Sequence, residues 1–188
     1  MILVDEIEIT VKVDSSYEKL HSDLIQQGFK IIDEFFMEDI YMIDKNIDTS
    51  NMKDLDVLSK CVLIREVNDY KAFVFKIKEY DENENIISQR KIDCRVHDIL
   101  EAVNFLNLIG YVELIKIKNN SYIYSNDDYE IAVQLVNDKY IFIEMEANEK
   151  YNTIDSLISE FSKLNIDYDR NNYFSKKAQI ILNERGCN

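Results

Sequence analysis

Two pairs of glutamates stand at every second position of segments that are otherwise apolar. Glu6 and Glu8 form one pair near the N-terminus, and Glu144 and Glu146 form the other. Alternate residues of a strand point to the same face, so the two carboxylates of each pair should lie side by side. Carboxylate oxygens are the ligands that Mg²⁺ and Mn²⁺ prefer. The spacing therefore predicts a metal site, provided that the two strands meet.

Basic side chains follow the same two-residue spacing in the middle of the chain. Arg65 stands within CVLIREV, and Lys76 and Lys78 share one face of YKAFVFKIKEY. Guanidinium and ammonium groups hold phosphate oxygens through charge-assisted hydrogen bonds. Carboxylates and cations that face each other across one interior would suit a polyphosphate bound through a metal ion.

The elements that must position these residues are mostly strands. One alternating strand normally means a solvated outer face, but here the apolar face is strong in strand after strand and needs cover. We therefore expect an α+β fold, a closed antiparallel β-barrel (tunnel) with its charged faces inward and its helices packed outside. The expected strands span residues 7–14, 29–43, 61–67, 70–80, 90–96, 111–124, 129–136 and 139–147, with helices at 15–27, 98–109, 153–164 and 173–184 and polar loops at 44–60 and 81–87.

Two stretches repeat one plan. In each, a strand leads through a helix to a glycine, Gly28 or Gly110, and then to a long strand with a late tyrosine, Tyr41 or Tyr124. Glycine suits the position after a helix because it adopts positive φ freely. The pattern fits an internal duplication, and it fits equally two unrelated β-α units.

Composition restricts the function classes. The 188 residues suit a single domain, residues 1–188. The net charge of −14 argues against nucleic acid and anionic membranes as partners. No apolar run is long enough to cross a bilayer, and the acidic N-terminal segment does not fit a signal peptide. Cys61, Cys94 and Cys187 have no metal-ligand spacing, which favours reduced thiols and a cytoplasmic location.

The order and spacing of these segments resemble the CYTH superfamily, the triphosphate tunnel metalloenzymes that include class IV adenylyl cyclases, thiamine triphosphatases and inorganic triphosphatases. The segments that carry the resemblance are EIEIT, EDIY, LIRE, FKIK, YEIAVQLV and FIEME, and they span nearly the whole chain. The resemblance implies a bound Mg²⁺ or Mn²⁺ and a triphosphate-containing partner such as ATP, tripolyphosphate or thiamine triphosphate. A homodimer is a further expectation from resemblance. The implied metal ligands are Glu6, Glu8, Glu144, Glu146 and, more distantly, Glu130. The implied phosphate ligands are Arg65 and Lys76, and Lys78 lies two residues after Lys76 on the same strand face.

The chain departs from the family pattern at several positions. The lysine of E-x-E-x-K is Thr10, the first arginine of L-R-x-R is Leu63, and the aspartate of the C-L-D strand is Gln134. The family's basic pair before Tyr124 falls on Asn119 and Ser121. Each lost cation removes a charge-assisted contact with phosphate, unless Lys12 or, after a one-residue slip, Lys118 compensates.

Two functions therefore remain open from sequence. One is a divergent metal-dependent enzyme, an adenylyl cyclase or a triphosphatase. The alternative is a catalytically degenerate tunnel that binds a nucleotide or polyphosphate without turnover, which the lost cations favour.

Overall fold

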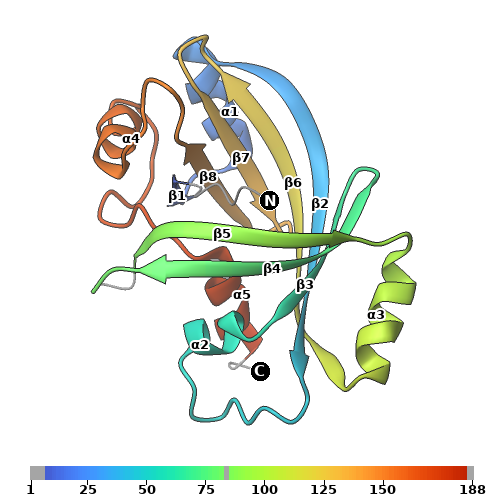
Figure 1. Ribbon diagram of the computed structural model, residues 1–188. Coiled ribbons are helices and arrows are strands. Elements are labelled where there is room, and N and C mark those ends of the chain that lie inside the picture. The colour runs from blue at the N-terminus through green and yellow to red at the C-terminus, as the bar shows by residue number, and fades with distance from the viewer. Residues whose placement is uncertain (1–6, 83–84, 186–188) are drawn as a thin grey trace.

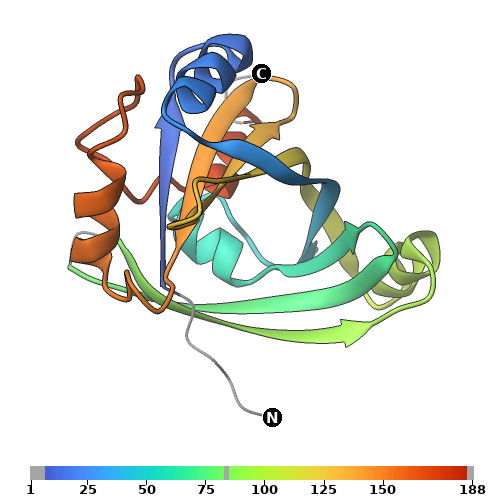
Figure 2. The ribbon, with the colours of Figure 1, turned by 90° about the horizontal axis from the view of Figure 1, so that it is seen from above.

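The computed structural model describes residues 7–82 and 85–185, and its main element is one antiparallel sheet of eight strands (Figure 1). The sheet curls strongly, so that one face is concave and the other convex (Figure 2). This confirms an α+β fold built on a curled antiparallel sheet. The strands are β1 (Glu8–Val13), β2 (Lys30–Asp44), β3 (Val62–Val67), β4 (Tyr70–Tyr80), β5 (Ile86–Arg95), β6 (Tyr111–Ser125), β7 (Glu130–Val136) and β8 (Tyr140–Glu146).

The strand order, β1-β8-β7-β6-β2-β3-β4-β5, has the same form when read from either end. Each half consists of a strand, a helix and three antiparallel strands, and the halves meet where β2 pairs with β6. Gly28 and Gly110 follow the helices of the two halves, and both have positive φ, 88° and 102°. This symmetry favours the internal duplication over two unrelated β-α units.

The two outer strands, β1 and β5, come close without pairing. In the described part of the chain no backbone ladder joins them, although Gln89 Nε2 donates a hydrogen bond of 3.4 Å to Glu8 Oε1 across the gap. The structure thus shows a half-barrel, and full closure of the barrel remains a prediction.

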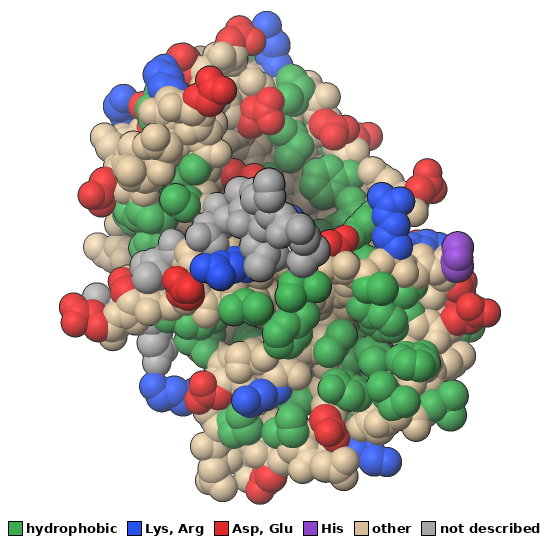
Figure 3. Space-filling view, in the orientation of Figure 1, with side chains coloured by type: hydrophobic (Ala, Val, Ile, Leu, Met, Phe, Trp, Pro, Cys, Tyr) green, Lys and Arg blue, Asp and Glu red, His purple; other side chains and the backbone are tan. Residues whose placement is uncertain are grey.

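Three helices cover the convex face. Leu20 and Phe161 pack into the apolar layer outside β1, β7 and β8, and Ala102 and Leu106 pack outside β2 and β3. Past Phe73, no described helix covers the convex face of β4 and β5, where hydrophobic side chains gather at the surface (Figure 3). No described helix is long and apolar enough to span a membrane. The three helices are α1 (Tyr17–Gln26), α3 (Ile99–Leu108) and α4 (Ile154–Phe161).

Two further helices, α2 (Asp54–Ser59) and α5 (Lys177–Arg185), lie against the concave face (Figure 2). The expectation of a loop over 44–60 was wrong for α2. This helix has no side-chain N-cap, and it is held by Val57, which is buried in a cluster with Ile43 of β2 and Leu114 of β6. The expected start of the last helix at 173 was also wrong, because residues 173–175 instead bond to β1 at Thr10.

We predict that Gly28→Ala lowers the free energy of unfolding by about 1–2 kcal/mol, because an L-residue is strained at positive φ. An added Cβ would meet no atom within 4 Å, so the cost comes from the backbone alone. Urea unfolding measures it. Gly28→Asn is the matched variant and should lose less, since asparagine tolerates this conformation; equal stability of Gly28→Ala and the natural protein would contradict the argument.

Candidate functional site

A cavity of about 360 Å³ opens on the concave face, and residues from all eight strands line it together with residues of α2 and of the start of α5. Its volume is in the usual range for small-molecule sites, about 300–1,000 Å³. The lining contains six basic and four acidic side chains, which is the reverse of the whole chain's balance. The basic side chains are Arg65, Lys76, Lys78, Lys91, Lys176 and Lys177, and the acidic ones are Glu8, Asp39, Glu144 and Glu146.

Three carboxylates converge on one wall. Glu8 of β1 lies opposite Glu146 of β8 in the strand pairing, and Glu144 is the next inward residue of β8. One carboxylate oxygen from each residue lies within 4.8 Å of the others. A cluster of hard oxygen ligands at this spacing fits Mg²⁺ or Mn²⁺. The predicted shared face of Glu8 and Glu144 is confirmed.

The two deeper carboxylates differ in protonation. Burial raises the pKa of Glu8 to about 7, and the negative charge of Glu144 adds to the rise. Burial by itself would raise the pKa of Glu144, but the nearby cations, Lys177 first and then Lys76 and Arg65, together outweigh it and hold that pKa below its usual value. Near neutral pH the pair therefore shares less than two full negative charges until a cation approaches.

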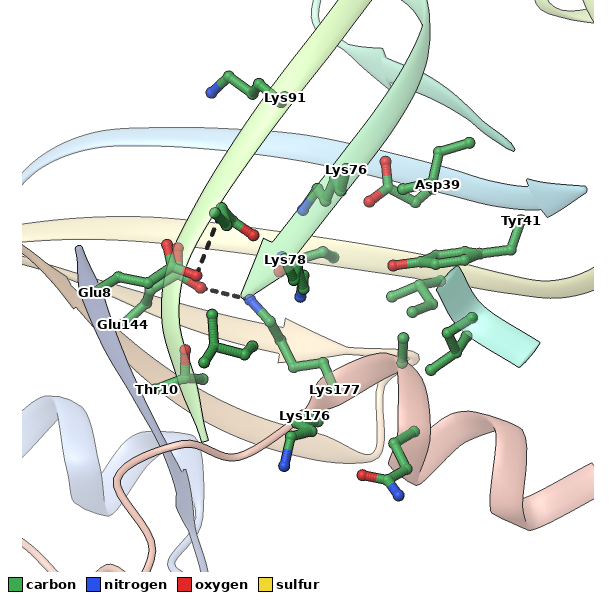
Figure 4. Close-up of a pocket in the computed structure, with 18 of the residues that line it drawn as sticks. Glu8, Thr10, Asp39, Tyr41, Lys76, Lys78, Lys91, Glu144, Lys176 and Lys177 are labelled. Carbon is green, nitrogen blue, oxygen red and sulfur yellow. Dashed lines mark hydrogen bonds and ion pairs between the residues drawn. The ribbon is translucent and has the colours of Figure 1, made fainter. Parts of the chain in front are cut away.

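Basic side chains occupy the opposite wall (Figure 4). Lys76 and Lys78 project from the inward face of β4, and burial lowers the pKa of both, that of Lys78 to about 8. Arg65 of β3 forms a two-pronged ion pair with Asp39 of β2, with Nε 2.7 Å from Oδ1 and Nη2 2.6 Å from Oδ2. Arg65, Lys76 and Lys78 thus line the same interior as the glutamates.

Lys177, which the sequence reasoning missed, is bound to the wall that carries the carboxylates. Its Nζ donates to Gln134 Oε1 at 2.5 Å and to Glu144 Oε2 at 2.6 Å. Its place is fixed by β1, because Thr10 N donates to the carbonyl of Tyr173 and Ser175 N donates to the carbonyl of Thr10. These bonds hold the start of α5 at the cavity. The only signal in the sequence was a pair of lysines at the N-terminal end of the last helix.

Asp39 was also missed. It belongs to EDIY, a segment that we used for the resemblance without assigning it a role. Asp39 is only 4% exposed, and its carboxylate holds Arg65 in a fixed position. The sequence did contain a signal for Asp39, because it stands two residues before Tyr41 and so lies on the same face of β2. In the strand pairing it is directly opposite Arg65.

Four of the predicted site residues are not placed at the carboxylate cluster. Glu6 lies outside the described residues. Glu130 lines a neighbouring depression that shares Glu144 and Glu146 with the cavity. Lys12 follows Thr10 on the same face, but its ammonium lies beside Asp14 and the ring of Tyr140.

Lys118 is on the other face of the sheet. Asn119 takes the inward position on β6, so Lys118 points outward and lies 3.9 Å from Glu38. The one-residue slip that would bring Lys118 inward is therefore absent from the strand pairing, where Asn119 lies opposite Met37 and Lys118 opposite Glu38.

We predict that Asp39→Asn lowers the free energy of unfolding by about 3–5 kcal/mol, because it leaves the guanidinium of Arg65 buried without its counter-charge. Asp14→Asn makes the same chemical change in the exposed pair with Lys12 and should cost less than about 1 kcal/mol. Urea unfolding of both variants measures the difference. Equal losses would mean that the Arg65–Asp39 pair contributes no more than a surface pair.

No family model matches the chain. A candidate adenylate cyclase of Methanocaldococcus jannaschii is 26% identical over 169 residues, which cover 87% of this chain and 91% of that protein. Among solved structures, a proposed adenylyl cyclase from Hippeastrum, described as having a dominant triphosphatase activity, has a TM-score of 0.62 at 14% identity and covers 96% of both chains. A Pyrococcus horikoshii protein has a TM-score of 0.61 at 16% identity, covering 89% of this chain and 98% of its own. The resemblance of this chain to the CYTH superfamily, predicted from its motifs, is thus confirmed in sequence and in fold.

Proposed function

We propose that the chain is one CYTH-like domain whose cavity binds a triphosphate-containing small molecule together with a divalent metal ion. The observation that carries this proposal is the convergence of three carboxylates with Arg65, Lys76, Lys78 and Lys177 in a single cavity. The names of the relatives, adenylate cyclases and a triphosphatase, point to the same class of ligand. Glu8, Glu144 and Glu146 would hold Mg²⁺ or Mn²⁺, and the bound ion would neutralise charge on the phosphates.

The chain's own residues would position the phosphates. Burial lowers the pKa of Lys76 and of Lys78, because it disfavours the charged ammonium form. An anion bound between them and Lys177 would favour that form. Arg65 is held by Asp39 and offers its remaining N–H groups to a phosphate oxygen. Lys177 would replace the lysine of the family's E-x-E-x-K pattern, which is Thr10 in this chain, because Thr10 and Lys177 both lie next to Glu144.

A second candidate, binding without turnover, is favoured by Leu63. This residue is 2% exposed and packs with Ala72, Val74 and Tyr41, so the wall where the family has an arginine carries no charge here. Asn119 and Gln134 are likewise buried and neutral. Fewer cations mean weaker stabilisation of the charge that develops during phosphoryl transfer.

One assay separates the two candidates. ATP, tripolyphosphate and thiamine triphosphate are each incubated with Mg²⁺ or Mn²⁺, and the products are quantified alongside a measurement of binding. Turnover that disappears in Glu144→Gln supports the enzyme, whereas binding without product supports the binding module. Absence of binding for every compound would contradict both.

We predict that Mn²⁺ raises the melting temperature of the protein, because it relieves repulsion among the three carboxylates. Glu146→Gln should reduce the rise, as should Glu8→Gln. Glu113→Gln, at an exposed position on β6, is the matched control and should keep the full rise. A rise that is unchanged in the first two variants would place the metal elsewhere.

We also predict that Lys177→Ala weakens the binding of Mn²⁺–tripolyphosphate by about tenfold or more, since a charge-assisted contact contributes roughly 1.5–3 kcal/mol. Thr10→Lys in the same protein should restore most of the loss, because position 10 lies opposite Glu144. Isothermal titration measures both. Lys139→Ala, on the surface beside Glu184, is the control. A failure of Lys177→Ala to weaken binding would remove Lys177 from the phosphate site.

A further inference from the structure

The convex face of the sheet is covered by helices in one half of the molecule more fully than in the other. By the symmetry of the strand order, β4 corresponds to β8 and β5 to β1. On β8, the outward residues Ile143 and Met145 are fully buried in an apolar cluster that includes Leu157 of α4. On β4, the outward residues Phe75 and Ile77 are 39% and 44% exposed. The described part of the chain thus contains no counterpart of α4 over β4 and β5.

The outer side of α3, next to this part of the sheet, is apolar as well. Glu101 is the one charged residue of the helix, and Leu100 and Leu108 are both exposed, Leu108 by 87%. The ring of Phe105, also exposed, lies 6.3 Å from the ring of Phe73 on β4. A helix that is apolar on all sides is normally buried on all sides. The composition of α3 therefore indicates that its outer side is covered by something else.

These side chains form one apolar surface, which we call the uncovered face (Figure 3). It consists of Phe75 and Ile77 of β4, Ile92 of β5, and Phe105 and Leu108 of α3. At about 150–250 Å² for each large side chain, the exposed fractions correspond to roughly 400–650 Å² of apolar surface. Apolar patches of this size are as large as the largest on ordinary monomers, and such patches commonly mark interaction sites.

Charge indicates what kind of partner the uncovered face takes. The net charge of −14 disfavours both a second copy and an anionic membrane on this face, because like charges repel. Acidic side chains border the face, namely Glu79 and Glu82 near the end of the β4–β5 hairpin and Glu101 one helical turn before Phe105. Arg90, which projects from β5 beside them, lies 3.8 Å from Glu79. A partner with basic side chains around an apolar centre would be complementary.

We propose that the uncovered face binds an amphipathic helix of a partner protein, which lays its apolar side on β4 and β5 and carries lysine or arginine on its polar side. Amphipathic helices commonly bind other proteins in this way. The helix would lie beside α3, in the position that α4 takes over β8 and β1. The fold itself shows that a helix fits there, because α4 covers the equivalent strands with residues spaced along one helix side: Ile154, Leu157, Ile158 and Phe161. The partner would lie directly behind the basic wall of the cavity, since β4 carries that wall on its inward face.

A synthetic peptide based on α4 is the probe for this test. It contains residues 151–165 of this chain with Asp155→Lys and Glu160→Lys, so it keeps the apolar side of α4 and has a basic polar side. The same peptide with the natural sequence is the control for charge. Each peptide carries a fluorescent label, and its anisotropy is measured as the protein is added.

We expect the lysine peptide to bind the natural protein with a dissociation constant on the order of 1–100 μM, because the face is smaller than a standard interface. The peptide with the natural sequence should bind at least about threefold more weakly at low salt. Ile77→Ser should weaken the lysine peptide about tenfold or more, because it places a hydroxyl group in the centre of the face. Ile32→Ser is the matched control, since it makes the same change at a strand residue that is also exposed, on β2, and it should leave the affinity unchanged.

Three outcomes would overturn the proposal. The first is a lysine peptide that does not bind the natural protein, or that binds Ile77→Ser and Ile32→Ser equally well. The second is self-association of the protein, measured by sedimentation, that Ile77→Ser abolishes, which would assign the face to a second copy. The third is binding to vesicles of phosphatidylcholine and phosphatidylserine that Ile77→Ser abolishes, which would assign the face to a membrane. If Ile77→Ser does not fold, Leu108→Ser, at the most exposed residue of the face, is measured against the same criteria.

Discussion

The ion pair between Lys177 and Glu144 is the contact on which the interior of this protein depends. A curled sheet with carboxylates on its inward face is unfavourable by itself, because buried like charges repel and lose their hydration. Lys177 places a cation among them, and its reach is fixed by the backbone bonds of residues 173–175 to Thr10. The end of the chain thereby becomes part of the site, although it lies far from β1 in sequence.

Internal pairing also means that any ligand must exchange partners with the protein. Glu144 is engaged by Lys177, and Arg65 by Asp39. A metal ion that takes a carboxylate oxygen from Lys177 leaves an ammonium group in need of an anion, and a phosphate that takes the ammonium leaves a carboxylate in need of a cation. The two ligands together give both groups a partner, whereas either ligand alone leaves one buried charge unpaired, which is unfavourable. A site of this kind would favour the metal complex of a polyphosphate, the ligand proposed above, over its separate components.

Alternation along single strands was enough to predict the strongest features. The two-residue spacing placed Glu8, Glu144, Arg65, Lys76 and Lys78 on one inward face, because in a strand parity alone fixes direction. The same rule puts Lys118 outward beside the inward Asn119, and an assumed slip in register was needed to bring it in. Local pattern could not find what depends on distant contacts. The place of Lys177 follows from a loop that returns to β1, and α2 forms because Val57 finds a buried position in a cluster with Ile43 of β2 and Leu114 of β6.

The two halves of the symmetric strand order carry opposite charges on their inward faces. In the two halves, β4 corresponds to β8 and β1 to β5. The inward residues of β4 include Lys76 and Lys78, where those of β8 are Glu144 and Glu146. The outer strands follow the same division, since β1 brings Glu8 and β5 brings Gln89 and Lys91. Curling brings these unlike walls face to face, and their attraction opposes the opening of a sheet whose outer strands are not joined by a ladder within the described residues. The resulting gradient of charge across the cavity would suit a ligand that pairs a cation with an anion.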